Sequence, residues 1–495
     1  MNIPLAIASV ILLGGALLAL YLIRQHNARA VFFVTVFTLG AMGLPMAVSL
    51  VQFNEHIAPK LKTFELFDTQ QYSSWQMPDN ETLYAALLGV FIIVIIAVLF
   101  EVLVVATNQK PLKGELIPLP KNFHQHPARG SFIKITVLIP AHNEEKSLPE
   151  TLRSLQAQTR PPENIIVVAD NCTDATVEIA QRMGIQTFES MNNTHRKAGA
   201  LNQALSSVLP NMTHKDVIMV MDADSQINDT FLESAAYYFK NIPELDAIGG
   251  VFFGEQGHGL LGQFQRNEYV RYSDQIKRRG GRVFVLTGTS SLFRADALSA
   301  VASSRGVYIP GESGQVYDTA ALTEDNELTI ALKTLGCPMI SPTECRVTTE
   351  LMPTWRNLWV QRLRWQRGAV ENLGAYGFTK TTLRYWGQQI GIAYGTLALS
   401  SALAVTIFMA LAQDHWVWYP FWIGSGLIFS LERAITVRHG GRNAILLAIA
   451  IIPELIFDIF LQSVFIRVLI DTAKKSGASW GHVSHSQPTL EKAST

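Results

Sequence analysis

Two aspartates stand one residue apart at the end of an apolar run. The run at residues 217–221 is followed directly by Asp222, Ala223 and Asp224. Two anions beside a protein core repel each other and lose hydration, which costs on the order of several kcal/mol without a counterion. A hard divalent cation removes that cost, and Mg²⁺ or Mn²⁺ held by one or two carboxylates and by substrate phosphates is the usual arrangement at a nucleoside diphosphate. Without context, a solvated acidic turn is the more common explanation of such a pair.

Two earlier apolar runs also end in polar residues. Residues 135–139 are followed by the segment 140–145, which holds Ala141 and Glu144, and residues 165–169 are followed by Asp170. Turns and helix caps explain such residues about as well as a binding site does.

Amphipathic helical patterns at residues 147–157, 175–183 and 198–209 alternate with these three strand-like runs. This order predicts a largely parallel α/β sheet. Ligands of such sheets bind beyond the carboxyl ends of the strands, where the polar residues stand.

Charged residues at two further helix starts favour a binding site at the aspartate pair over a solvated turn. Arg196 and Lys197 open the helical pattern at 198–209, a place suited to a phosphate, although solvated basic residues at a helix entry are the simpler alternative. Thr323, Glu324 and Asp325 open another helical pattern. Capping and the helix dipole explain part of this acidic set but not obviously all of it.

Residues 355–372 predict a helix that lies at a membrane surface. The stretch 355–367 carries three tryptophans and four arginines, which suits a helix among lipid headgroups. Such a helix can still present Gln361, Arg364 and Trp365 to a site above the membrane.

The composition indicates membrane segments. Of 495 residues, 48% are hydrophobic and 16% are charged, and mean hydropathy is unusually high for a soluble protein. Lys plus Arg and Asp plus Glu balance at 40 each, so no basic character favours a nucleic-acid partner. The three cysteines neither pair completely nor match a metal-ligand spacing, which favours a reducing compartment.

The apolar stretches and their flanking charges predict a topology. Each of the stretches 4–23, 31–51 and 83–105 is long enough to cross a bilayer, and 387–411, 417–431 and 444–470 follow the polar middle. The positive-inside rule places residues 108–380 in the cytoplasm and 52–82 outside. We therefore expect a transmembrane region at 1–107, a cytoplasmic domain at 108–380, a second transmembrane region at 381–472 and a polar tail at 473–495. Arginines and lysines flank both ends of 444–470, which suggests a broken or re-entrant helix at Pro453.

The order of these motifs resembles the processive, membrane-integrated family 2 glycosyltransferases, the synthases of cellulose, chitin, hyaluronan and poly-N-acetylglucosamine. The resemblance spans residues 135–372, and its elements are IPAHNEE, VVADNCTD, RKAGALN, MDADS, GTSSLFR, TEDNEL and QRLRW. It implies a GT-A-like, Rossmann-like catalytic domain inserted between transmembrane helices. It also implies a location in the bacterial inner membrane with the catalytic domain in the cytoplasm.

The resemblance assigns a role to each matching residue. Asp325 would be the catalytic base, and Asp222 and Asp224 would bind Mg²⁺ or Mn²⁺. Contacts to the nucleotide-sugar would come from Ala141, Glu144, Asp170, Lys197, Asp222, Gln361 and Arg364. Contacts to the acceptor would come from Gly288, Thr289, Ser290, Glu324 and Trp365. Ala169 stands where many relatives carry an aspartate, which leaves Asp170 beside Asp174 as the carboxylates of that element.

The implied reaction inverts an α-linked UDP-sugar into a β-linked product, and UDP-N-acetylglucosamine or UDP-glucose is the expected donor. Export of a growing polysaccharide through the membrane helices is one hypothesis, and transfer of a single sugar to a membrane lipid is another. A transporter with a soluble insert is a third, suggested by Glu454 and Asp458 within an apolar stretch. Lipid bilayer and a glycan or lipid acceptor are thus the expected partners, and the sequence predicts no oligomeric state.

Overall fold

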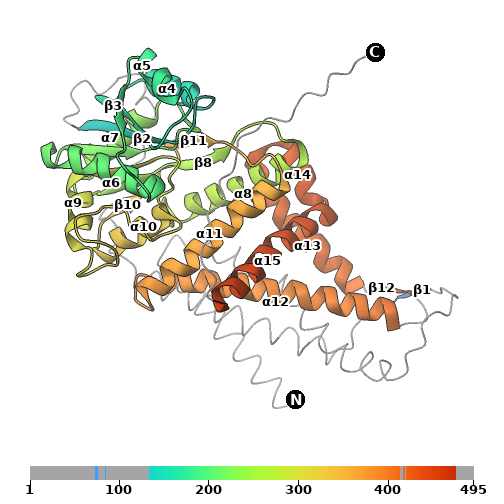
Figure 1. Ribbon diagram of the computed structural model, residues 1–495. Coiled ribbons are helices and arrows are strands. Elements are labelled where there is room, and N and C mark those ends of the chain that lie inside the picture. Colours follow the sequence, from blue (N-terminus) through green and yellow to red (C-terminus); the bar gives the residue numbers. More distant parts are fainter. Residues whose placement is uncertain are drawn as a thin grey trace, which may run out of the picture.

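The computed structural model describes residues 73–75, 84, 88, 133–412, 416–418 and 420–474. An α/β region formed by the middle of the chain lies against a group of long helices formed mainly by its C-terminal part (Figure 1). The predicted membrane spans at 4–23 and 31–51, nearly all of 83–105, and the tail from 475 onward lie outside the described residues.

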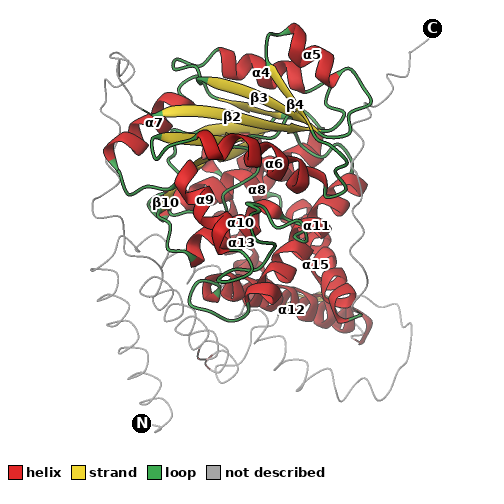
Figure 2. Cartoon of the chain, turned by 60° about the vertical axis from the view of Figure 1, so that its left-hand side comes forward, coloured by secondary structure: helices red, strands yellow, loops and turns green. Residues whose placement is uncertain are grey.

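A seven-stranded sheet forms the centre of the α/β region (Figure 2). In sheet order its strands are β10 (Met339–Ile340), β7 (Ala247–Gly249), β9 (Ser291–Arg294), β5 (Asp216–Val220), β2 (Lys134–Ala141), β3 (Asn164–Ala169) and β4 (Gln186–Glu189). All neighbouring pairs are parallel except the two that involve β9, which runs antiparallel to β5 and β7. The predicted, largely parallel sheet is confirmed; β2 and β3 contain the first two predicted strands, and β5 contains the third except for its last residue, Met221.

Alternation of side chains across the sheet explains how helices cover both of its faces. On β2, Val137 and Ile139 pack into one core and Leu138 into the other, as the period of two in a strand requires. The first core lies under α4 (Leu148–Gln156), α5 (Thr176–Arg182) and α7 (Phe231–Asn241). The second lies under α6 (Arg196–Val208), α9 (Ala295–Ser304) and α10 (Glu324–Thr334). The predicted helices at 147–157, 175–183 and 198–209 correspond to α4, α5 and α6.

A second sheet joins the α/β region to the helices. It has the order β6 (Ser225–Ile227), β11 (Arg346–Thr349), β8 (Val251–Gly254), and β8 leads into α8 (Gly259–Arg278). A 3-10 turn, η4 (Leu209–Asn211), follows α6, and a short parallel pair joins β1 (Ser73–Trp75) to β12 (Trp416–Trp418).

The C-terminal helices begin with α11 (Trp355–Tyr376), which confirms a helix where the sequence predicted one at 355–372. The others are α12 (Leu383–Ala412), α13 (Pro420–Thr436), α14 (Arg442–Ile449) and α15 (Ile451–Ala473), with the 3-10 turn η5 (Arg438–Gly440) before α14. Apolar contacts join α8 and α11 to α14 and α15: Phe264 stacks on Phe457 with ring centroids 4.7 Å apart, and Trp355 meets Phe460 at 5.0 Å.

One described helix, at Leu383–Phe408, is long and apolar enough to cross a membrane. Helices α14 and α15 meet the combined criteria of length and apolar character only together, and they are bent by 83° relative to each other. The bend follows Ile449, so the predicted break exists but precedes Pro453, which lies inside the first turn of α15. The predicted transmembrane bundles are not shown by the described residues.

The two acidic residues of the last apolar stretch are ion-paired. Glu454 is buried and contacts Arg271 at 2.9 Å and Arg433 at 3.1 Å, and Arg433 also contacts Asp458 at 2.7 Å. Paired charges explain the burial of Glu454 and the partial burial of Asp458 without an ion or substrate pathway. The feature that suggested a transporter is therefore accounted for by packing between α8, α13 and α15.

Candidate active site

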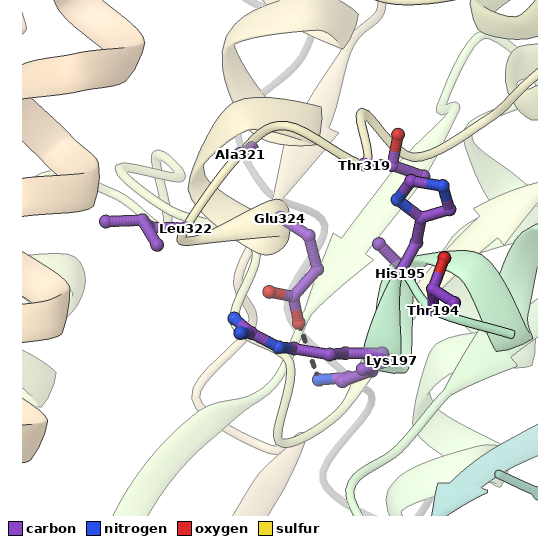
Figure 3. A pocket seen from close by; sticks show the side chains of 9 residues that line it. Thr194, His195, Lys197, Thr319, Ala321, Leu322 and Glu324 are labelled. Atoms are coloured by element: carbon purple, nitrogen blue, oxygen red, sulfur yellow. Dashed lines mark ion pairs between the residues drawn. The ribbon is translucent and has the colours of Figure 1, made fainter. Parts of the chain in front are cut away.

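Lys197 holds two carboxylates from distant parts of the chain. Its Nζ lies 2.6 Å from Asp222 Oδ1, just after β5, and 2.9 Å from Glu324 Oε1, the first residue of α10. Figure 3 shows the Lys197 and Glu324 side chains pointing toward each other from opposite walls of a pocket. Burial alone would lower the pKa of Lys197, but the two carboxylates raise it well above its usual value. Lys197 is therefore a fixed cation at this point.

Gly288 closes the cluster from a third direction. Its carbonyl accepts a hydrogen bond from Asp222 N at 3.2 Å. A Cβ at this position would lie 2.7 Å from Lys197 Nζ and 3.3 Å from Asp222 Oδ2. Only a glycine lets the backbone approach the ion pair so closely.

Asp325 lies beside this cluster and has the environment of a base. Its Oδ2 accepts from Gly288 N at 3.1 Å, and its Oδ1 accepts from Asn326 N at 2.7 Å. Burial and the negative charge of Glu324 raise the pKa of Asp325 to about 6, against the opposing effect of Lys197. Burial pushes the pKa of Glu324 up as well, but Lys197 outweighs it and the net pKa is lowered. Adjacent carboxylates with pKa values moved apart are typical of a site that transfers protons.

The loop after β5 carries the predicted metal ligands. Thr151 Oγ1 donates to Ala223 O at 2.7 Å and Ser225 Oγ donates to Asp224 Oδ1 at 3.2 Å, which fixes the loop between Asp222 and Asp224. Lys197 already supplies the counterion that the sequence argument required for Asp222. Within the described part of the chain, no group of three or more His, Cys, Asp or Glu side chains is arranged to hold a metal ion. Two carboxylates with oxygens from a bound diphosphate still suit Mg²⁺ or Mn²⁺.

The predicted nucleoside contacts lie at the ends of β2 and β3. Asp170 is buried, and its Oδ1 accepts hydrogen bonds from Ser190 at 2.7 Å and Asn193 at 2.8 Å. Its backbone N donates to Ala141 O at 2.8 Å, which joins the two strand ends. Glu144 N donates to Thr176 Oγ1 at 2.8 Å. Asp170 thus organises the loop between β4 and α6, which leads directly to Lys197.

Helix α11 carries Gln361, Arg364 and Trp365, and Arg364 lies near the cluster. The charge of Arg364 contributes to the lowered pKa of Glu324, which places its guanidinium near α10. Arg362, inside the same motif, donates to Gln361 Oε1 at 2.9 Å and lies 4.3 Å from the centre of the Trp365 ring. Trp365 keeps 37% of its surface exposed. The Trp365 ring is thus covered on one side by Arg362 and remains partly exposed.

Of the residues predicted to contact an acceptor, one is fully buried. Ser290 has 0% exposure, and a Cβ on Gly250 would lie 2.0 Å from its hydroxyl oxygen. Thr289 is partly exposed and forms a 2.8 Å hydrogen bond with Thr287 between their hydroxyls. Gly288 and Thr289 therefore line the open side of this loop, and Ser290 lies in the core beneath it.

Two residues that sequence reasoning did not single out join α11 to α10. A Cβ on Gly368 would lie 2.4 Å from Thr323 Oγ1, so the helices touch closely there. Asn372, one turn further, donates to Thr323 Oγ1 at 3.2 Å and to Asn326 Oδ1 at 3.0 Å. A small and a polar residue four positions apart on one helix face is the signal that could have indicated this contact.

The pocket of Figure 3 opens beside the cluster, between the start of α6 and the loop before α10. It is lined by Thr194, His195, Arg196, Lys197, Ala198, Thr319, Ala321, Leu322 and Glu324. Its charge is mainly positive, with the N-terminal end of α6 at one wall, which suits an anionic group.

Comparisons with known proteins support the family that the motifs resemble. Residues 136–301 match the family described as Glycosyl transferase family 2. The poly-beta-1,6-N-acetyl-D-glucosamine synthase of Staphylococcus aureus (strain COL) is 28% identical over 250 residues, which are 48% of this chain and 55% of that protein. The protein of the same name from Staphylococcus epidermidis (strain ATCC 35984) is 27% identical over 276 residues, 54% of this chain and 60% of that one. The chain thus spans little more than half the length of these curated relatives.

Among solved structures, the mannosyltransferase PcManGT from Pyrobaculum calidifontis, in complex with GDP-Man and Mn²⁺, is 14% identical. The alignment covers 77% of this chain and 95% of that one with a TM-score of 0.49, too low to assign a ligand to this chain. The family match supports the predicted GT-A-like fold, with a sheet that is mixed because of β9.

Proposed function

Because the chain carries a family 2 glycosyltransferase domain at residues 136–301, we propose that it is an inverting, metal-dependent hexosyltransferase that extends a β-linked polysaccharide from a UDP-sugar. The observation that carries this proposal is the cluster in which Lys197 bridges Asp222 and Glu324 beside Asp325. Two relatives named as poly-beta-1,6-N-acetyl-D-glucosamine synthases favour UDP-N-acetylglucosamine over UDP-glucose as the donor.

The cluster suits the departure of a diphosphate. Negative charge develops on the leaving group, and fixed cations that face it stabilise the transition state. Lys197 is such a cation, and Arg364 approaches the same place with a guanidinium fork that matches phosphate oxygens. Asp222 and Asp224 are the residues that would hold Mg²⁺ or Mn²⁺, and a bound cation supplies further neutralisation of the diphosphate charge.

Asp325 suits activation of the acceptor. A hydroxyl becomes a better nucleophile as a carboxylate within hydrogen-bond reach takes its proton. A pKa of about 6 leaves Asp325 ionised at neutral pH and makes it a stronger base than an ordinary aspartate. Direct attack by one activated hydroxyl, with no enzyme nucleophile, inverts the anomeric centre.

The membrane side of the site suits a glycan acceptor. Trp365 offers an exposed ring held by Arg362, and sugar rings stack on such surfaces. Helix α11 continues toward α12, the described helix with the length and hydropathy of a span. We propose that the growing chain meets the enzyme here, on the cytoplasmic side, and leaves through the bilayer.

A donor panel tests this function. The purified full chain in lipid nanodiscs is given UDP-N-acetylglucosamine, UDP-glucose or other UDP-sugars with Mg²⁺ or Mn²⁺, and UDP release and product size are measured together. The expected result is metal-dependent UDP release from one donor with a product of many sugars. A lipid carrying one sugar would establish the alternative acceptor, and no UDP release from any donor would contradict the proposal.

A further inference from the structure

One face of α10 holds a neighbouring loop at three points. Asp325, Thr329 and Lys333 are spaced by four residues, so their side chains lie on the same side of the helix. The segment at residues 283–288 passes along this side in the opposite direction, and it has no regular secondary structure. Each of the three side chains bonds to the backbone of this segment.

The first two points lie at the site. Gly288 N donates to Asp325 Oδ2 at 3.1 Å. Leu286 N donates to Thr329 Oγ1 at 2.9 Å, and the Thr329 hydroxyl donates in turn to Asp325 O at 2.7 Å. Thr329 is completely buried, so its hydroxyl has exchanged water for these two protein partners. The bond from Leu286 N to Thr329 therefore fixes the backbone two residues before Gly288, whose N–H faces Asp325.

Lys333 makes the third point at the far end of α10. Its Nζ donates to Val283 O at 2.9 Å, to Phe284 O at 3.1 Å and to the Tyr385 hydroxyl at 2.7 Å. Tyr385 in turn donates to Phe284 O at 2.6 Å. These three acceptors hold the amino group of Lys333 between the 283–288 segment and α12.

The surroundings of Lys333 indicate that it works as a hydrogen-bond donor. Burial is the main cause that lowers its pKa well below the usual value, and the nearby cations Arg384 and Arg279 lower it further. Burying an amine costs stability unless the group is hydrogen-bonded, and Lys333 makes three such bonds. The bonds it makes end on the loop that carries Gly288 and on the first turn of α12.

We propose that Lys333 is a positioning residue for the transfer reaction: it anchors the 283–288 segment to α10 and to Tyr385 so that Gly288 N stays directed at Asp325 Oδ2. This inference rests on the proposed function, in which Asp325 is the base. It also joins α12 to the site, because Tyr385 belongs to α12 and shares Phe284 O with Lys333.

The consequence is measurable through the titration of Asp325. A hydrogen bond from Gly288 N stabilises the ionised carboxylate and lowers its pKa, so loss of the bond raises it. The other groups that act on this titration are Glu324 on α10, Lys197 from α6, Tyr272 from α8 and Tyr317 from the loop before α10. None of them contacts Lys333 in the bonds described above.

The test compares Lys333→Met with Lys380→Met, which removes an exposed lysine elsewhere. UDP release is measured from pH 4.5 to 8 as kcat and KM for the UDP-sugar, with the melting temperature of each variant. For Lys333→Met we expect the acid limb of kcat to move up by about one pH unit, kcat at its plateau to fall about tenfold, and KM to stay within about twofold. The control is expected to keep the wild-type limb.

A second pair of variants keeps the test valid if Lys333→Met fails to fold. Thr329→Val removes the hydroxyl that holds Leu286 N, and Thr329→Ser retains it. The valine variant is expected to show the same upward limb and the serine variant the wild-type limb. An unmoved limb in the folded Lys333→Met, or in Thr329→Val if that is the variant that folds, overturns the inference. If Asp325→Asn keeps wild-type turnover, the proposed function fails, and the inference fails with it.

Discussion

Glu324→Gln tests how the site sets the strength of its base. The pKa of Asp325 is about 6, against 3.8 for an ordinary aspartate, so the whole shift is about 2 units. Burial is the larger cause and persists in the variant, whereas the charge of Glu324, the second cause, disappears. Lys197 also loses one of its two anionic partners and acts more strongly on Asp325. Both changes lower the pKa of the base, by about 1 unit in total.

The sign of the pH effect follows from the role of the base. Asp325 acts in its ionised form, so turnover falls as the pH drops through its pKa. The acid limb of kcat, near pH 6 in the wild type, is therefore expected near pH 5 in Glu324→Gln, with plateau kcat lower by about three- to tenfold because a weaker base remains.

The assay is the initial rate of UDP release at saturating donor across that pH range. The exposed Glu312→Gln serves as the matched control, since it removes the same charge from a loop outside the site. A limb that stays in place or moves upward in Glu324→Gln, while Asp325→Asn is inactive, would refute the proposed coupling of the two carboxylates.

Three further outcomes are expected. Arg305→Met is expected to destabilise the fold by about 3–5 kcal/mol, because Glu327 then loses a buried partner 2.7 Å away. Denaturant titration measures the free energy of unfolding, and a loss under about 1 kcal/mol would contradict this expectation. Gly368→Ala is expected to cost about 1–3 kcal/mol and to lower turnover, since its Cβ would lie 2.4 Å from Thr323 Oγ1. Gly374→Ala in the same helix meets nothing within 4 Å and should be neutral or stabilising. Thermal melts of both variants measure the difference, and equal losses in the two would count against the close packing. Chelation of divalent cations is expected to stop UDP release, and added Mg²⁺ or Mn²⁺ is expected to restore it. Undiminished UDP release in the presence of the chelator would show that the reaction does not depend on a metal ion.

Much of the site could be predicted because its residues follow local patterns. Apolar runs that end in polar residues located the strand ends, and the sheet then brought Asp222 beside the start of α6. The spacing alone did not show that Lys197 is the counterion of Asp222, since the partners are 25 residues apart and meet only through the sheet. Lys197 therefore neutralises part of the negative charge for which the sequence suggested a metal ion.

Other features depend on packing between elements and left little trace in the sequence. The antiparallel direction of β9 has no local signal in the sequence. Its four residues are polar at both ends and apolar in the middle, and this pattern is the same in either direction. Ser290 looked available beside Thr289, but the close approach of Gly250 places it in the core. Pro453 marked the break in the last apolar stretch, yet a proline is tolerated in the first turn of a helix, so the bend comes earlier.

The central claim is that Asp325, beside the cluster of Lys197, Asp222 and Glu324, drives sugar transfer from a UDP-sugar. The most direct measurement is UDP release by the wild type and by Asp325→Asn in the same nanodiscs, at saturating UDP-sugar and metal, with donor binding measured in parallel. The account predicts that Asp325→Asn binds the donor as the wild type does and releases UDP at least about a thousandfold more slowly. Wild-type UDP release by Asp325→Asn would contradict it.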